Sequence, residues 1–216
     1  MISKRKGIFI LFIIILSLIV GFCFYPHLPD KIATHWNEKN EVDGYSGKLF
    51  GILVFPIAML IVALFFMVLP RIDPLKKNYD KFQKYYEGLV LAMMLFLFAI
   101  HLWVLLWNVG IKLNFFIPAS TGFLIFFIGY ILENVKKNWF VGIRTPWTLS
   151  NENVWNRTHK LGGKLFRIAG LITVCCAFFI ENELYVIIIP VLIASLISVV
   201  YSYIEYSKEM KLINNK

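Results

Sequence analysis

The sequence predicts an all-α, polytopic membrane protein, a bundle of about six transmembrane helices with both chain ends in the cytoplasm. Hydrophobic residues make up 59% of its 216 residues and charged residues only 16%, and the mean hydropathy is +0.70. A soluble domain is roughly half apolar and a quarter charged. The apolar residues gather into runs of about 20 residues, the length of helix that crosses the hydrocarbon core of a bilayer. Lipid is therefore the expected solvent.

Six apolar runs are separated by shorter polar segments. Each is close to the length that a membrane-spanning helix needs at about 1.5 Å per residue. No small-x-small cleavage pattern follows the first run, so we expect it to be retained as an anchor. The runs cover residues 7–25, 49–69, 89–107, 115–132, 165–180 and 185–203.

The positive charges are sorted to one side of the predicted bundle. All but four of the 22 lysines and arginines lie in the N-terminus, the second and fourth connecting segments and the C-terminal tail. Positively charged loops stay in the cytoplasm, so these segments and both ends are predicted to be cytoplasmic. The basic residues flank apolar runs, so we expect contact with acidic lipid headgroups and no direct contact with nucleic acid. The four lysines that lie on the opposite side of the predicted bundle are Lys31, Lys39, Lys48 and Lys112.

Several residues inside the runs are expected to shape the helices. Pro56 and Pro190 are predicted to kink the second and sixth helices, and Gly122 and Gly129 to allow close packing of the fourth. The three cysteines show no metal-site or disulfide spacing, so we expect them to be buried as small hydrophobic residues. No metal or other cofactor is predicted.

The segment between the first two runs, residues 26–48, is predicted to be extracytoplasmic and structured. Prolines fix its exit from the first helix, and Asp43-Gly44 suits a tight turn before the second. The segment either shields the helix ends or recognises a ligand. A metal at His35 is a third interpretation, although no pair of residues here has a familiar ligand spacing. The candidate recognition residues are Leu28, Pro29, His35, Trp36 and Asp43.

This outer segment resembles the extracytoplasmic module known as DUF1648. The pattern of that module is Leu-Pro, a Thr-His-Trp-like step, then a Gly/Asp turn and Lys, and Asn40 stands where a glycine is common. The resemblance divides the chain into a DUF1648-like module at residues 1–69 and a second domain at residues 70–216, with a cytoplasmic loop at 133–164. The residues that carry it are Leu28-Pro29, Thr34-His35-Trp36, Asp43-Gly44 and Lys48.

The segment after the fourth run, residues 138–163, is predicted to be cytoplasmic. Thr145 is expected to have an extended backbone, because the residue before a proline disfavours the helical conformation, and Pro146 follows it. Ser150 is then expected to cap a short helix over residues 151–161, with Trp155 and His159 one turn apart on one face. One interpretation lays this amphipathic helix in the inner headgroup layer.

The other interpretation makes this segment a docking face for a cytoplasmic partner, because Arg and Trp are common at the centres of interfaces. The string from Gly142 to Leu149, with Trp155 a short way on, closely resembles the signature of the SdpI family of bacterial immunity proteins. With the outer module and the six-span layout, the resemblance covers residues 20–205. The candidate partner-binding residues are Gly142, Arg144, Thr145, Pro146, Trp147, Thr148, Trp155 and His159.

The resemblance implies immunity to a secreted peptide toxin that acts on the membrane. Some family members are similar to receptors that hold a transcriptional repressor at the membrane, so an ArsR-like repressor is a second implied partner.

One residue outside these segments, His101, leaves other functions open. His101 lies inside the third run, where an ionisable group is either functional or a neutral, hydrogen-bonded imidazole.

A small transporter or toxin exporter that uses His101 and the Arg144 loop is one alternative. Against it, the spans lack the series of acidic residues that a proton-coupled pump uses. A membrane enzyme with a metal at His35 is the other. No enzyme is expected, because one arginine, one histidine and scattered hydroxyls do not provide a nucleophile with a base and an orienting acid.

Overall fold

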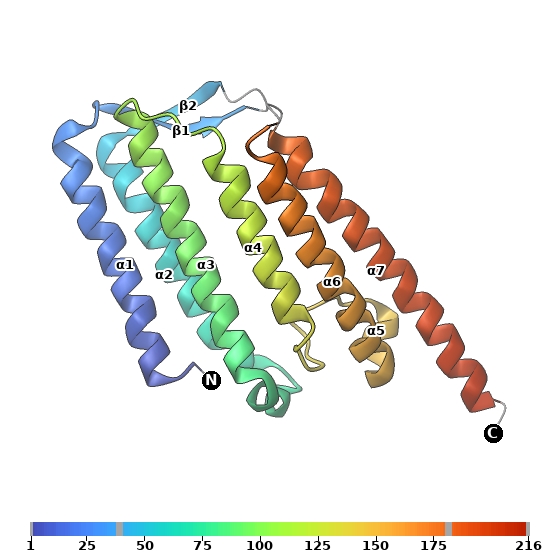
Figure 1. The fold of residues 1–216 in the computed structure, drawn as a ribbon. Helices are drawn as coiled ribbons and strands as arrows, with labels where there is room; N and C mark the ends of the chain where they lie inside the picture. Colours follow the sequence, from blue (N-terminus) through green and yellow to red (C-terminus); the bar gives the residue numbers. More distant parts are fainter. Residues whose placement is uncertain (1, 38–40, 180–182, 215–216) are drawn as a thin grey trace.

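The computed structural model describes residues 2–37, 41–179 and 183–214 as long helices lying side by side, with a two-stranded antiparallel hairpin across one end (Figure 1). The elements are α1 (Lys4–Phe24), a 3-10 turn (Tyr25–His27), β1 (Lys31–Trp36), β2 (Val42–Gly47), α2 (Lys48–Ile72), a second 3-10 turn (Lys76–Asn78), α3 (Tyr79–Asn108), α4 (Phe116–Leu132), α5 (Pro146–Ser150), α6 (Glu152–Cys176) and α7 (Glu183–Asn214).

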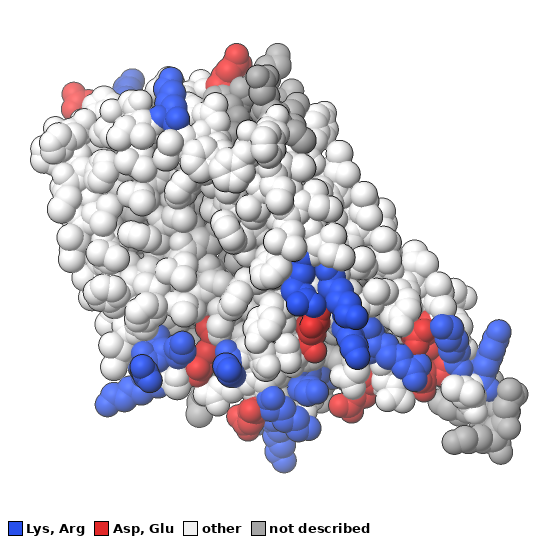
Figure 2. All heavy atoms as spheres, viewed as in Figure 1, with Lys and Arg blue, Asp and Glu red and all other residues white. Residues whose placement is uncertain are grey.

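The two ends of the bundle differ in chemistry. The hairpin lies over the ends of α2 and α3, whereas α1 begins and α7 ends at the opposite end, where α5 also lies (Figure 1). Lysine and arginine side chains gather at this opposite end (Figure 2). We call the two ends the hairpin end and the basic end.

The predicted all-α, polytopic membrane fold is confirmed, with the hairpin as an addition. Among the described residues, four helices are long and apolar enough to cross a membrane: α1, α2, α3 and α7. The apolar helix α4 is shorter, at 17 residues. The total of six spans stays a prediction, because α6 carries a polar N-terminal half.

The predicted short amphipathic helix over residues 151–161 is wrong. These residues form the first turns of α6, a single helix of 25 residues that runs on to Cys176, and residue 180, the predicted end of this span, lies outside the described residues. The cap is Asn151 instead of Ser150, and its side chain accepts hydrogen bonds from the backbone N–H groups of Asn153 and Val154. The consecutive glycines at 162–163 do not end the helix, because both are closely packed: Gly163 lies against Gly129 of α4, and Gly162 against Ser198 of α7.

Paired glycines bring α4 and α6 together, as predicted for Gly122 and Gly129. A Cβ atom at Gly129 would collide with the backbone of Gly163 and Arg167 on α6. One at Gly122 would collide with the backbone of Gly170 in the same way. The α4–α6 contact is the most extensive between helices of the described chain, since small residues let helix backbones approach closely.

One expectation about single residues needs correction. Cys23 and Cys175 are exposed on the protein surface instead of buried, because lipid offers an apolar surface residue the same environment as a core. Pro56 lies inside α2 and Pro190 inside α7, and the kinks at these prolines stay predictions. Helix α3 contains a non-helical residue, Phe82, with φ −132° and ψ 22°.

Candidate functional site

The segment with the family signature lies at the basic end, between α4 and α6, and includes α5. Gly142 has φ +127°, a conformation that side chains other than glycine rarely adopt. A Cβ atom there would also collide with the imidazole of His159 and press on the Trp155 ring. Glycine is therefore required here both by the backbone and by the space available.

His159 holds the loop through both of its ring nitrogens. Its Nδ1 lies 2.8 Å from the carbonyl oxygen of Trp155, one turn earlier, and its Nε2 accepts a hydrogen bond of 2.9 Å from the backbone N–H of Ile143. This pattern assigns the proton to Nδ1 and makes the ring neutral. The side chain is almost fully buried, and burial lowers the pKa of His159 to about 4.

Trp155 is the centre of the packing beneath this loop. It is fully buried, its ring stacks on the imidazole of His159 with centroids 4.0 Å apart, and its Nε1 donates to the carbonyl oxygen of Val135. The same hydrophobic cluster includes Ile10 of α1 and Tyr86 of α3. The predicted shared face of Trp155 and His159 is confirmed, but that face points into the protein.

Thr145 and Thr148 form a capping box around the first turn of α5, with Pro146 at its first position. The Thr145 hydroxyl also makes a hydrogen bond of 3.0 Å with Ser202 on α7. Trp147 is half-buried, with its ring 5.1 Å from that of Tyr203. The signature residues of α5 therefore attach this loop to α7.

Asp73 and Asn138 join two loops at the basic end, and the sequence did not single out either of them. Asp73 accepts hydrogen bonds from the backbone N–H of Trp139 and from the Tyr79 hydroxyl, while Asn138 accepts from Phe140 and Val141 and donates to Val141. The available signal was Asp73 before Pro74, a combination typical of turns whose carboxylate accepts a hydrogen bond two residues on, as it does from Leu75.

The exposed part of the signature segment is small. Arg144 is exposed and donates a hydrogen bond of 2.7 Å to the carbonyl oxygen of Trp139, whose own side chain is 48% exposed. Pro146 is exposed as well, whereas Thr145, Thr148, Trp155 and His159 are buried. The buried residues can serve partner binding only by fixing the shape on which Arg144, Trp139 and part of Trp147 are displayed.

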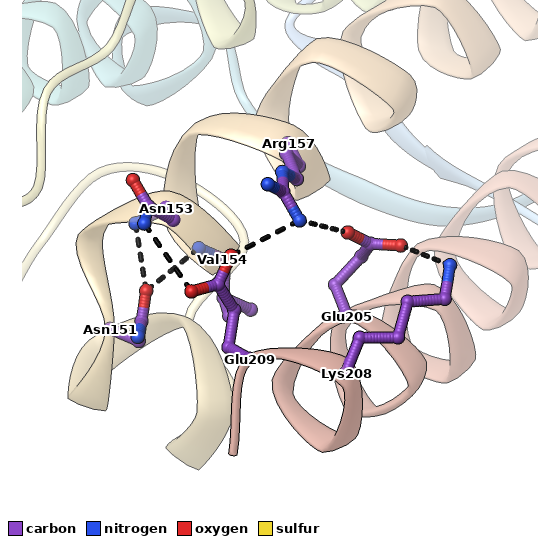
Figure 3. A network of polar contacts seen from close by, with 7 residues as sticks. All are labelled: Asn151, Asn153, Val154, Arg157, Glu205, Lys208 and Glu209. Atoms are coloured by element: carbon purple, nitrogen blue, oxygen red, sulfur yellow. Dashed lines mark hydrogen bonds and ion pairs between the residues drawn. The ribbon is translucent and has the colours of Figure 1, made fainter. Parts of the chain in front are cut away.

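A charged network joins α6 to α7 beside this loop (Figure 3). Arg157 lies 2.8 Å from a carboxylate oxygen of Glu205 and 3.2 Å from one of Glu209. Lys208 contacts the second oxygen of Glu205 at 2.7 Å, and Asn153 donates to Glu209. The network fixes the C-terminal part of α7 against the start of α6.

At the hairpin end, the predicted recognition residues divide into exposed and buried groups. His35 and Asp43 face each other across the two strands, with Nδ1 and Oδ1 2.5 Å apart, and both are exposed. Pro29 is exposed and Leu28 is buried. Asp43 and Gly44 lie within β2 and do not form the predicted tight turn, because Gly44 must pass close to the His35 side chain. Asn40 lies outside the described residues.

The hairpin is anchored on α3. Trp36 packs against Trp103 and Trp107, with centroid distances of 4.6 and 5.6 Å. The Asn108 side chain accepts from the backbone N–H of Ala33 at 2.7 Å and donates to its carbonyl oxygen at 3.1 Å. Asn108 thus pairs with β1 as a neighbouring strand would.

His101 lies in the interior between α1, α2 and α3. Its Nδ1 is 2.7 Å from the hydroxyl of Ser17, its ring stacks on Phe55, and it is fully buried. Its Nε2 has no hydrogen-bond partner among the described residues. Within the same residues, no three His, Cys, Asp or Glu side chains come together in a way that could hold a metal ion.

The fold and these sites define a polytopic α-helical membrane protein with an anchored hairpin at one end and a buried tryptophan–histidine stack beneath a loop at the other. The SdpI/YfhL protein family profile matches residues 134–202, and that of the DUF1648 domain of unknown function matches residues 12–60. A curated relative, "Immunity protein SdpI" of Bacillus subtilis (strain 168), is 30% identical over 210 residues, which are 94% of this chain and 97% of the relative. The chain belongs to the SdpI/YfhL protein family. No solved structure matches it.

Proposed function

We propose that this protein gives its cell immunity to a secreted antimicrobial peptide toxin that acts on the membrane. The observation that supports this most strongly is the 30% identity to an immunity protein along 94% of the chain, because the similarity includes both ends of the bundle and not one module alone. The protein is proposed to act by binding the toxin, which requires no catalytic group.

The proposed toxin-recognition surface is the exposed side of the hairpin, which comprises Pro29, His35 and Asp43, together with Tyr45, which is 64% exposed. Leu28 and Trp36 support this surface from beneath. A surface fixed to α3 by Asn108 and the tryptophan cluster favours binding, since little conformational entropy is lost when the ligand arrives. In the proposed orientation both chain ends are cytoplasmic, so the hairpin faces outside, where a secreted toxin arrives.

The experiment that tests immunity is a co-culture. A strain of the host that lacks this gene is grown beside its toxin-producing parent, and its membrane potential is followed with a voltage-sensitive dye. We expect the deletion strain to depolarise and lose viability, and expression of the wild-type chain to restore both. A deletion strain that keeps its potential in the parent's culture supernatant would refute the proposal.

A second function is proposed for the basic end, where the chain is suited to hold a cytoplasmic, ArsR-like transcriptional repressor. The observation that favours it is the exposed pair Arg144 and Trp139, displayed on a loop that Asp73, Asn138 and His159 make rigid. Co-purification of the membrane protein with a repressor encoded beside it tests this. Arg144→Ala should abolish co-purification without affecting immunity, and unchanged co-purification would contradict the assignment of this surface.

A further inference from the structure

An apolar groove with a basic end lies between α3 and α4. Its volume is about 660 Å³, within the range of ligand sites in proteins. Along α3 its lining extends from Lys84 to Ala99, a length of about 22 Å at ~1.5 Å per residue. That length exceeds half of the ~30 Å hydrocarbon core, so the groove can follow an acyl chain through one leaflet.

The groove exists because small residues of α3 face large ones of α4. Gly88, Ala92 and Ala99 line it on one side, and Phe123 and Phe127 on the other. The Phe127 ring lies at ordinary contact distance, 3.6 Å, from the place where a Cβ atom of Gly88 would be. Phe123 is 64% exposed, so the groove opens sideways towards the lipid and not into an aqueous vestibule.

The end of the groove nearest the basic end of the bundle is polar and positively charged. It is lined by Lys6 of α1, Lys84 and Tyr85 of α3 and Tyr130 of α4, and the two tyrosine rings are 5.8 Å apart. Within the described part of the chain, neither lysine makes a salt bridge.

An acidic side chain that interacts electrostatically with Lys6, Glu87, is already engaged in hydrogen bonds. One of its carboxylate oxygens accepts hydrogen bonds from the backbone N–H of Ser3 and from the side chain of Gln83. The negative charge of Glu87 partly offsets the positive charge of Lys6, but the two side chains do not form a salt bridge. Two ammonium groups therefore remain available to an anion at the mouth of the groove.

We propose that this groove binds one molecule of an acidic phospholipid, with its phosphate between Lys6 and Lys84 and an acyl chain along Gly88, Ala92 and Ala99. Basic pockets between transmembrane helices at the membrane surface recognise acidic lipid headgroups. A helical peptide is the wrong size, because a ~22 Å length of helix about 10 Å across occupies on the order of 1,700 Å³. The site is separate from the hairpin and from the Arg144 loop, so it is independent of the proposed immunity function.

Native mass spectrometry of the purified full-length protein, with added phosphatidylglycerol or phosphatidylcholine, tests this site. The wild type should retain one phosphatidylglycerol in preference to phosphatidylcholine. The double variant Lys6→Gln, Lys84→Gln should weaken phosphatidylglycerol binding by about tenfold or more, since each basic side chain near an acidic headgroup contributes about 1 kcal/mol. The matched control, Lys76→Gln with Lys77→Gln, removes the same charge from exposed positions of the basic end and should bind as the wild type does.

The acyl-chain part of the site is tested separately by Ala92→Phe, which fills the groove and keeps both lysines. It should also lose the bound lipid, whereas Leu64→Phe, at an exposed apolar position of α2, should not. Photo-crosslinking of the wild type with a diazirine-labelled phosphatidylglycerol avoids variants altogether and should label the facing sides of α3 and α4. Equal losses in the two lysine variants, full binding by Ala92→Phe, or labels confined to other helices would each overturn the proposal.

Discussion

The imidazole of His159 lies face to face with the indole of Trp155, one helical turn away on α6. The Nε2 atom of His159 accepts a hydrogen bond from the backbone N–H of Ile143. The donor at Ile143 can be satisfied only by a neutral ring, because a protonated imidazole has no acceptor. The family signature loop therefore depends on the absence of charge at His159.

Acid should loosen this loop. The pKa of His159 falls from its usual value of 6.5 to about 4 on burial, so the unfolded chain takes up a proton at a higher pH than the folded one. The stability gained from the neutral ring is complete above about pH 6.5 and is lost as the pH falls towards 4, a change of up to about 3 kcal/mol. Thermal unfolding in detergent should show a midpoint that drops over this interval, and His159→Gln should flatten the curve. Parallel curves for variant and wild type would contradict this role.

Gly142→Ala should be more disruptive than Gly110→Ala. The new methyl group adds a steric collision with His159 to a backbone cost of about 1–3 kcal/mol for the positive φ. Gly110→Ala is the matched control, because Gly110 also has a positive φ, +94°, but nothing near its Cβ position. Fluorescence-detected size exclusion after heating should rank wild type first, then Gly110→Ala, then Gly142→Ala. Equal loss of stability in the two variants would show that the collision with His159 has no effect.

Arg157 and Glu205 should be energetically coupled. The guanidinium is about half exposed and the carboxylate almost buried, so we expect the effects of the two single substitutions on stability to be non-additive. A double-mutant cycle with Arg157→Ala and Glu205→Ala, followed by chemical denaturation in detergent, measures it. Arg157 with Glu133 provides the comparison, since Glu133 pairs with Arg167 on a different face. That second cycle should give additive effects, and additivity in the first would exclude the coupling.

Asn108→Ala should release the hairpin from α3. Both hydrogen bonds to the backbone of Ala33 would be lost, and β1 would keep β2 as its strand neighbour. Hydrogen–deuterium exchange should therefore increase at residues 31–36 by about tenfold, as expected for the loss of roughly 1–1.5 kcal/mol of protection. Asn134→Ala is the control: it removes a half-buried side chain just after α4 that donates to the carbonyl oxygen of Tyr130, and it should leave exchange in the hairpin unchanged.

The sequence predicted the membrane fold well because solvent sets its pattern: long apolar runs and sorted charge follow directly from the bilayer. It also placed Gly122, Gly129, Trp155 and His159 in their helices. It could not show that α6 is continuous through Gly162 and Gly163, because packing against α4 and α7 outweighs helix propensity there. Nor could the sequence show that Trp155 is buried. The loop that covers it is held by Asp73 and Asn138, which lie 65 positions apart in the sequence and both make hydrogen bonds with the Tyr79 hydroxyl.

Helix α3 touches both ends of the molecule, with Asn108 bonded to the hairpin and Tyr79 bonded to Asp73 at the opposite end. Its 30 residues form a rod of about 45 Å, interrupted by the irregular backbone at Phe82, less than one turn from Tyr79. The hairpin and the loops of the basic end are therefore both attached to one element, and α3 is the shared support of the two ends of the bundle.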